Sequence, residues 1–232
     1  MFEALSSLEF APFILSFKLA GITTVILFGI SLFIAWYLSQ THSRYKPIIE
    51  AITALPIVLP PSVLGFYILF TLSHNSAIGA FFYEFFGVKL VFNFTGLVIA
   101  SCFYSLPFMV QPLQSGFEAL PKNMLEASYI AGKSTWATLF KVALPNIKPS
   151  LMTAIVITFA HTVGEFGVVL MVGGSIPGQT KVASVAIYEM VEIMDYTSAH
   201  IYSGIMVLIN FLILIVVYIF NRKQAHRIGG VA

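Results

Sequence analysis

The chain has 232 residues, of which 58% are apolar and only 9% are charged, and its formal net charge is +2. A typical soluble domain carries roughly 25% charged residues, so this composition argues against a soluble enzyme. The small net charge and the scattered basic residues argue against a nucleic-acid-binding protein. We therefore predict an all-α polytopic integral membrane protein, because a helix satisfies its own backbone hydrogen bonds in lipid.

Five segments are long and apolar enough to cross a bilayer, whose roughly 30 Å hydrocarbon core takes about 20 helical residues. The predicted spans are about 12–38, 48–72, 94–117, 150–172 and 201–221. The whole chain, 1–232, is then one transmembrane domain. The aromatic segment 73–93 suits an interfacial helix, with a docking surface for an external partner as the alternative. Segment 181–195 is too polar to span, which predicts an interfacial amphipathic piece or a re-entrant one.

Positive charge is concentrated on one side of these spans. Loops 39–47 and 118–149 and the tail after 221 carry nine of the 12 Lys and Arg residues. The positive-inside rule places these segments in the cytoplasm. We therefore expect a multi-pass protein with its N-terminus outside and its C-terminus in the cytoplasm.

The second and third predicted spans combine prolines with hydroxyl side chains. Prolines inside a helix leave carbonyls without donors and bend it, and such backbone is tolerated only beside protein or a watery cavity. Neutral hydroxyl donors bind an anion weakly enough to release it. Packing at small residues is the alternative explanation. The candidates for a translocation path and gate are Pro56, Pro60, Pro61, Ser62, Ser101 and Ser105.

The fourth predicted span adds Thr158, His161, Thr162 and Glu165, which share one helical face by their spacing. A carboxylate within a membrane segment is costly and marks a functional-site hypothesis, although a structural hydrogen-bond network explains it equally well. Because a carboxylate repels an oxyanion, we expect Glu165 to hold nearby backbone or a neighbouring helix. His161 lacks partners at zinc-site spacing, so no metal site is expected.

The segment between the third and fourth spans, 118–149, predicts two short helices that lie flat on the cytoplasmic face. Gly132 suits the left-handed turn that ends the first helix, and Ser134 suits the N-cap of the second. The second helix is expected to run to Leu144. An ordinary interfacial helix hairpin is the alternative to a specific docking loop.

This segment resembles the EAA loop of ABC-importer permeases, whose pattern is Glu-Ala-Ala, three residues, Gly, nine residues, Ile-x-Leu-Pro. The resemblance implies that the loop docks on a separate ATP-hydrolysing subunit. Ser128 and Val142 are the two departures from the pattern. The matching positions are Glu126, Ala127, Ser128, Gly132, Val142, Leu144 and Pro145.

Three further segments, 55–61, 164–167 and 176–180, resemble molybdate permease subunits and their sulfate/thiosulfate relatives. The resemblance implies a type I ABC-importer permease in a bacterial inner membrane. Its implied partners are a second copy of the chain, two ABC ATPase subunits that hold ATP and Mg, and an extracytoplasmic oxyanion-binding protein. The chain itself is expected to bind no cofactor. Molybdate is the expected substrate, with tungstate or sulfate/thiosulfate as alternatives.

Two other classes of protein fit the sequence less well. An intramembrane enzyme would need a motif such as H-E-x-x-H or G-x-S-x-G, and neither occurs. A secondary transporter would usually show inverted repeats or paired broken helices. The run Gly132-Lys133-Ser134 resembles the end of a phosphate-binding loop, but Ala127 stands where that motif needs glycine.

The resemblance and the span number also suggest where the pore lies. A chain of five spans encloses little volume, and membrane oligomers favour closed symmetry, so we expect a path at a two-fold homodimer interface. The second, third and fourth spans should line this path. The first span should lie at the periphery against lipid.

Overall fold

The computed structural model describes residues 9–229, and this part of the chain is all helical. The elements are α2 (Ala11–Gln40), α3 (Lys46–Val58), α4 (Pro61–Leu72), α5 (Ala77–Phe86), α6 (Phe94–Glu118), α7 (Lys122–Ile130), α8 (Thr135–Thr138), the π-helical turn η1 (Leu139–Ala143), α9 (Leu144–Asn146), α10 (Lys148–Gly164), α11 (Gly167–Gly173), α12 (Ala183–Glu192) and α13 (Tyr196–Gly229). The first eight residues, at which we expected an external N-terminus, lie outside the described part.

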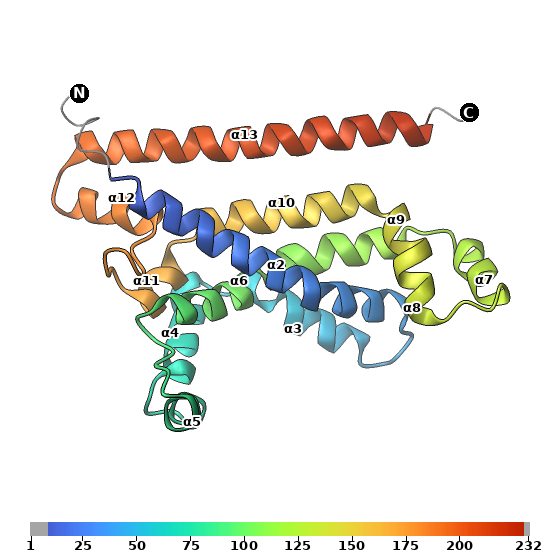
Figure 1. The fold of residues 1–232 in the computed structure, drawn as a ribbon, viewed down its shortest axis with the longest axis horizontal. Coiled ribbons are helices and arrows are strands. Elements are labelled where there is room, and N and C mark those ends of the chain that lie inside the picture. The colour runs from blue at the N-terminus through green and yellow to red at the C-terminus, as the bar shows by residue number, and fades with distance from the viewer. Residues whose placement is uncertain (1–8, 230–232) are drawn as a thin grey trace.

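Four long helices, α2, α6, α10 and α13, run side by side along the longest axis of the molecule (Figure 1). Helices α7 and α8 lie at one end of this bundle, and α11 and α12 lie at the opposite end. We call these the α7 end and the α12 end. Three single helices are long and apolar enough to cross a membrane, or up to five spans if each of two bent helix pairs counts as one.

Helix α2 has one face buried in the bundle and one exposed apolar face, which includes Ile22, Val25 and Ile26. The expectation that the first span lies against lipid stays a prediction. Half of the most apolar window of α2 is buried, against 17% for α13. Small side chains such as Ala20, Thr23 and Ala35 are fully buried and let neighbouring helices approach closely. Toward the α7 end, Trp36 packs edge-on against Phe117 of α6. Helix α13 is therefore more exposed than α2.

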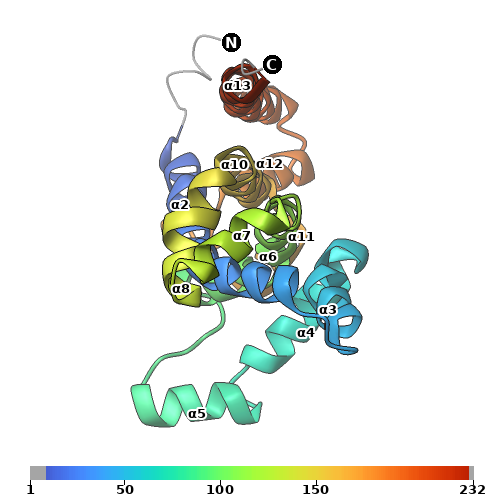
Figure 2. The same cartoon turned by 90° about the vertical axis from the view of Figure 1, so that its right-hand side faces the viewer.

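The second predicted span is divided into α3 and α4, whose axes differ by 110°. The predicted bend is present, and it lies at Leu59 and Pro60, where the backbone turns extended. Proline 60 has no N–H to continue the helical ladder, which explains the position of the break. Pro56 lies inside α3. Helix α4 therefore points across the bundle, and α5 lies beyond it (Figure 2).

The fourth predicted span is also interrupted, which corrects the expectation of one helix over 150–172. Helix α10 ends at Gly164, Glu165 is extended, and α11 begins at Gly167. Before α10, the segment Thr135–Asn146 joins it at an angle of 82°. Part of the segment expected to be a surface loop is therefore helical and meets α10 at a sharp bend.

The segment 118–149 confirms the prediction of two short helices that meet at a glycine. Gly132 has φ +73° between α7 and α8. The Ala137 N–H donates to Ser134 Oγ at 3.2 Å, so Ser134 is the predicted N-cap. Ser128 Oγ lies 2.9 Å from Thr138 Oγ1. The serine that departs from the EAA pattern therefore joins the two helices.

Two short helices lie toward the α12 end of the chain. Helix α5 begins at the N-cap Ser76 and ends at the left-handed Gly87, and most of its aromatic side chains are exposed. Helix α12 packs against α13 and α2, and the Ala183 N–H donates to Ser16 Oγ at 2.9 Å. The polar segment 181–195 is thus a short helix packed on the bundle.

The close crossing of α6 and α10 predicts opposite effects of two alanine substitutions. A Cβ at Gly116 would lie 2.6 Å from Ser150 Cβ, whereas a Cβ at Gly21 of α2 would meet nothing within 4 Å. We expect Gly116→Ala to lower the free energy of unfolding by about 1–3 kcal/mol through overpacking. Gly21→Ala should raise it by up to about 1 kcal/mol through helix propensity. Thermal unfolding in detergent measures both, and equal midpoints would contradict the packing.

Candidate functional site

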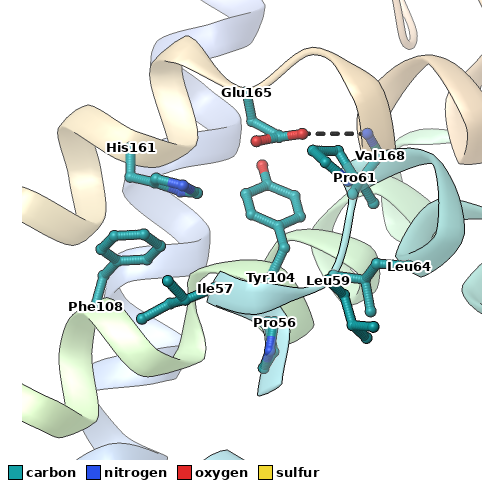
Figure 3. A pocket seen from close by; sticks show the side chains of 10 residues that line it. All are labelled: Pro56, Ile57, Leu59, Pro61, Leu64, Tyr104, Phe108, His161, Glu165 and Val168. Atoms are coloured by element: carbon teal, nitrogen blue, oxygen red, sulfur yellow. Dashed lines mark hydrogen bonds between the residues drawn. The ribbon is translucent and has the colours of Figure 1, made fainter. Parts of the chain in front are cut away.

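A pocket of about 140 Å³ lies where the two helix breaks face each other (Figure 3). One side comes from the end of α3 and the start of α4, the other from α10 and α11, and α6 lies between them. The lining residues are Pro56, Ile57, Leu59, Pro61, Leu64, Tyr104, Phe108, His161, Glu165 and Val168. Interrupted helices in a membrane are tolerated beside protein or a watery cavity, and both breaks meet this condition here.

Two glycines allow α4 and α11 to lie close enough to form this pocket. A Cβ at Gly167 would lie 2.7 Å from Pro61 Cβ. A Cβ at Gly65 would lie 2.9 Å from Met171 Cβ and 3.3 Å from Val168 Cα. All three distances are shorter than ordinary van der Waals contact. The glycine at the end of the 164–167 segment thus has a packing role that the sequence alone did not reveal.

Glu165 holds the second break in place, as its sequence position suggested. Its Oε1 accepts a hydrogen bond from the Val168 N–H at 3.2 Å, close to the start of α11 (Figure 3). Its backbone carbonyl accepts a hydrogen bond from Ser184 Oγ at 2.6 Å. The first N–H groups of a helix have no partner within that helix, so this carboxylate satisfies one of them.

His161 lies in the same pocket against aromatic rings. Its imidazole stacks on Phe108 with ring centroids 3.8 Å apart and also contacts Tyr104. His161 Nδ1 lies 3.4 Å from Ser105 Oγ. Among the described residues, no group of three or more His, Cys, Asp or Glu side chains could hold a metal ion. The imidazole lies among aromatic rings, and Tyr104 and Glu165 supply the other polar groups of the lining.

Four of the hydroxyl candidates are buried between helices and do not line the pocket. Ser105 Oγ lies 2.8 Å from Thr162 Oγ1, which also donates to the backbone carbonyl of Thr158 at 2.8 Å. Of the stripe on the fourth span, only His161 and Glu165 reach the pocket. The four buried residues are Ser101, Ser105, Thr158 and Thr162.

Of the four candidates around the first break, only two line the pocket. Pro56 and Pro61 line the pocket, Pro60 forms the break, and Ser62 is exposed at the start of α4. Sequence reasoning did not select Phe108 as a site residue. It lies four residues after Tyr104 on the same face of α6, and that spacing is the signal that could have found it.

The α7 end presents a second candidate surface. Ile130 is 87% exposed and Trp136 is 60% exposed, and both follow the Glu126–Ser128 motif closely. Within the motif, Glu126 and Ala127 are exposed, whereas Ser128 is buried. Leu144 is half-buried and Pro145 is exposed. Such exposed apolar side chains beside a charged residue suit a protein–protein contact.

The loop between α11 and α12 is fixed by polar contacts at the α12 end. Gly174 and Gly178 have positive φ, and the Ile176 N–H donates to Thr180 Oγ1 at 2.9 Å. Lys181 forms an ion pair with Glu189 of α12. Burial acts to raise the pKa of Glu189, but the hydrogen bond and the charge of Lys181 outweigh it and hold the pKa below its usual value. This ordered loop contains the segment 176–180.

The described part of the chain is a helical membrane bundle, with two broken helices around a pocket and a helix hairpin at one end. The structure is similar to that of a bacterial ABC transporter that imports the acidic polysaccharide alginate, with a TM-score of 0.78. The match covers 96% of this chain and 82% of that chain at 16% sequence identity, so it shows the fold alone.

Sequence comparison then shows the family. Residues 26–226 match the family described as binding-protein-dependent transport system inner membrane component, and the chain belongs to this family. It is 48% identical to the molybdenum transport system permease protein ModB of Azotobacter vinelandii, over 95% of this chain and 98% of the relative. It is 29% identical to a probable sulfate transport system permease protein of Chlorella vulgaris, over 94% and 82%.

Family membership decides between the classes that the sequence left open. The chain is a membrane permease component and not an enzyme, and it works with an ATPase and a binding protein. The structure corrects one expectation about secondary transporters. We expected no paired broken helices, and the structure contains two helix pairs with sharp breaks. The family match, and not the absence of breaks, therefore excludes that class.

The hydrogen bond from the Val168 N–H predicts how two Glu165 variants differ. Glu165→Ala removes the acceptor and should lower the free energy of unfolding by about 0.5–2 kcal/mol, the range for losing a helix N-cap. Glu165→Gln retains a side-chain oxygen and should lose less than half of that. Thermal unfolding of both variants in detergent checks this. Equal losses would show that the charge matters and the hydrogen bond does not.

Proposed function

We propose that this chain is the permease subunit of an ATP-driven importer that moves molybdate across a bacterial inner membrane. The observation that carries this proposal is the 48% identity to the Azotobacter molybdenum permease over nearly the full length of both chains. The match covers 95% of this chain, so it extends over the pocket, the α7 end and the α12 end. A likeness of fold alone would not favour one substrate over another.

The surfaces on the chain support the proposed assembly. We place the α7 end in the cytoplasm, because the loops and the tail with most of the Lys and Arg residues lie there. Two copies of the chain form the pore, and the exposed surface of α7 and α8 docks on each of two ATPase subunits, which bind ATP and Mg. An oxyanion-binding protein delivers the substrate at the α12 end. Five crossings result if α3 with α4 and the bent pair that ends in α10 each count as one.

The pocket suits transient passage of an anion. Its lining contains no lysine or arginine, and its polar groups are a phenol, an imidazole and the Glu165 carboxylate. An anion gains little from such walls and is repelled by the carboxylate, so it is not retained. Selectivity then belongs mainly to the binding protein. The breaks at Pro60 and Glu165 are the places where α3, α4, α10 and α11 change their relative orientation, because helical bonding is already interrupted there.

Sulfate, thiosulfate or tungstate import is the second candidate. The 29% identity to the Chlorella sulfate permease supports it, because sulfate and molybdate are both tetrahedral dianions. The lower identity makes sulfate the less favoured substrate. The pocket lining does not distinguish these anions by size.

Transport by the reconstituted importer tests the proposed substrate. The chain, its ATPase subunit and its binding protein are assembled in liposomes, and uptake of molybdate, tungstate and sulfate is measured with and without ATP. We expect ATP-dependent molybdate uptake that a tenfold excess of sulfate leaves unchanged. Sulfate uptake faster than molybdate uptake would move the proposal to the second candidate.

Gly132 provides a test of the docking loop. Its φ of +73° is unfavourable for β-branched residues, whereas asparagine tolerates this region. We expect Gly132→Val to insert normally but to lose most ATP-dependent uptake, and Gly132→Asn to retain most of it. Membrane content and uptake are measured side by side. Full uptake and full ATPase stimulation in Gly132→Val would contradict this role of the turn.

A further inference from the structure

A cluster of four polar side chains joins the start of α3 to the end of α6. Lys46 Nζ lies 2.8 Å from Glu118 Oε1 and 3.7 Å from Glu50 Oε1. The Gln114 side-chain amide donates to Glu50 at 2.6 Å and to Glu118 at 3.0 Å. Two carboxylates are thus held together by one ammonium group and one amide.

Beside this cluster, Ile49 of α3 is partly buried against the core that α2, α6 and α10 share. Helix α3 packs mainly on α6, and Thr53 is its one buried residue. The side chains of Ile52, Leu55 and Val58 are about half or more exposed. These exposed side chains contribute little packing within the chain, because only buried side chains touch many neighbours. The polar cluster is therefore a principal connection between α3 and α6.

The position of the cluster links two parts of the molecule that have different roles. Glu118 is the last residue of α6, and α7 begins four residues later at Lys122. The opposite end of α3 carries Pro56 and Ile57, which line the pocket at the helix break. A displacement of α6 and α7 would reach the pocket through α3 only if α3 moves together with α6.

The strength of this connection should depend on the sign of the charge at position 46. An isolated surface ion pair contributes little, because water screens it and side-chain entropy opposes it. Here Lys46 separates two carboxylates that both contact Gln114. Loss of the positive charge would leave these carboxylates facing each other and would push α3 away from α6. Reversal of charge at Lys46 should therefore have a larger effect than its neutralisation.

We propose that Lys46, Glu50, Gln114 and Glu118 form a polar strut that makes α3 move with α6 and α7, so that work done by the ATPase reaches the pocket. The four side chains are positioning residues and touch no transported anion. This role rests on the proposed function, since it requires a permease driven by an ATPase at the α7 end.

The ratio of anions moved to ATP hydrolysed tests the strut in the reconstituted importer. We expect Lys46→Glu to lower this ratio about tenfold, within the range of measured coupling between sites, while ATP hydrolysis continues. Lys46→Gln should lower it less. The charge exchange Lys46→Glu with Glu118→Lys should restore the ratio to within about twofold, since opposite charges again face each other.

Arg44→Glu is the matched control, because it reverses a positive charge two residues away on an exposed side chain whose guanidinium lies over the Tyr45 ring. Its ratio should equal that of the wild type. An unchanged ratio in Lys46→Glu, or no recovery in the charge exchange, overturns the strut. A ratio that falls equally in Arg44→Glu also overturns it, since the effect would then be one of general surface charge.

A measurement that needs no transported substrate separates the strut from the proposed function. Spin labels on Ile52→Cys in α3 and Ser115→Cys in α6, in a Cys102→Ser chain, report the distance between two exposed sites. We expect one narrow distribution with and without ATP, and a broad one in Lys46→Glu. A narrow distribution in Lys46→Glu overturns the strut. A wild-type importer that hydrolyses ATP but moves no molybdate contradicts only the proposed function.

Discussion

The structure depends on one constraint, which is that backbone polar groups in a membrane need partners even where a helix is interrupted. The chain has two such interruptions near its pocket, at Pro60 and at Glu165. Proline removes a donor at the first, and at the second a carboxylate accepts a hydrogen bond from the start of α11. The glycines at 65 and 167 let the two broken segments approach each other. The pocket is the space that remains between them.

The two sides of the pocket differ in the number of buried contacts that hold them in place. Helices α2, α6 and α10 share a buried core at the α7 end, and hydroxyl contacts such as Ser105 to Thr162 join α6 to α10. Helix α3 buries a single residue and is held by a polar cluster around Lys46. Firmly packed elements change their arrangement less easily than elements with few buried contacts. The part of the pocket formed by α3 is therefore the part best able to move.

The α7 end connects this movable side to the surface where the ATPase docks in the proposed assembly. Ser128 joins α7 to α8 through Thr138, and Gly132 provides the left-handed turn between them. The end of α6 continues directly into this hairpin and also carries Glu118. A hydrogen bond thus joins α7 to α8, a short connection joins both to α6, and the proposed polar strut adds α3.

The sequence by itself determined the membrane class, the family and the local turns. Low charge requires lipid surroundings, and the spacing from Glu126 to Pro145 identified the loop. Gly132 and Ser134 act through their own backbone conformation, so their roles were readable in sequence. The tertiary structure alone decided that α13 is more exposed than α2 and that Ser101 and Thr158 are buried. In a membrane protein both the lipid-facing and the buried sides of a helix are apolar, so no hydrophobic periodicity distinguishes them.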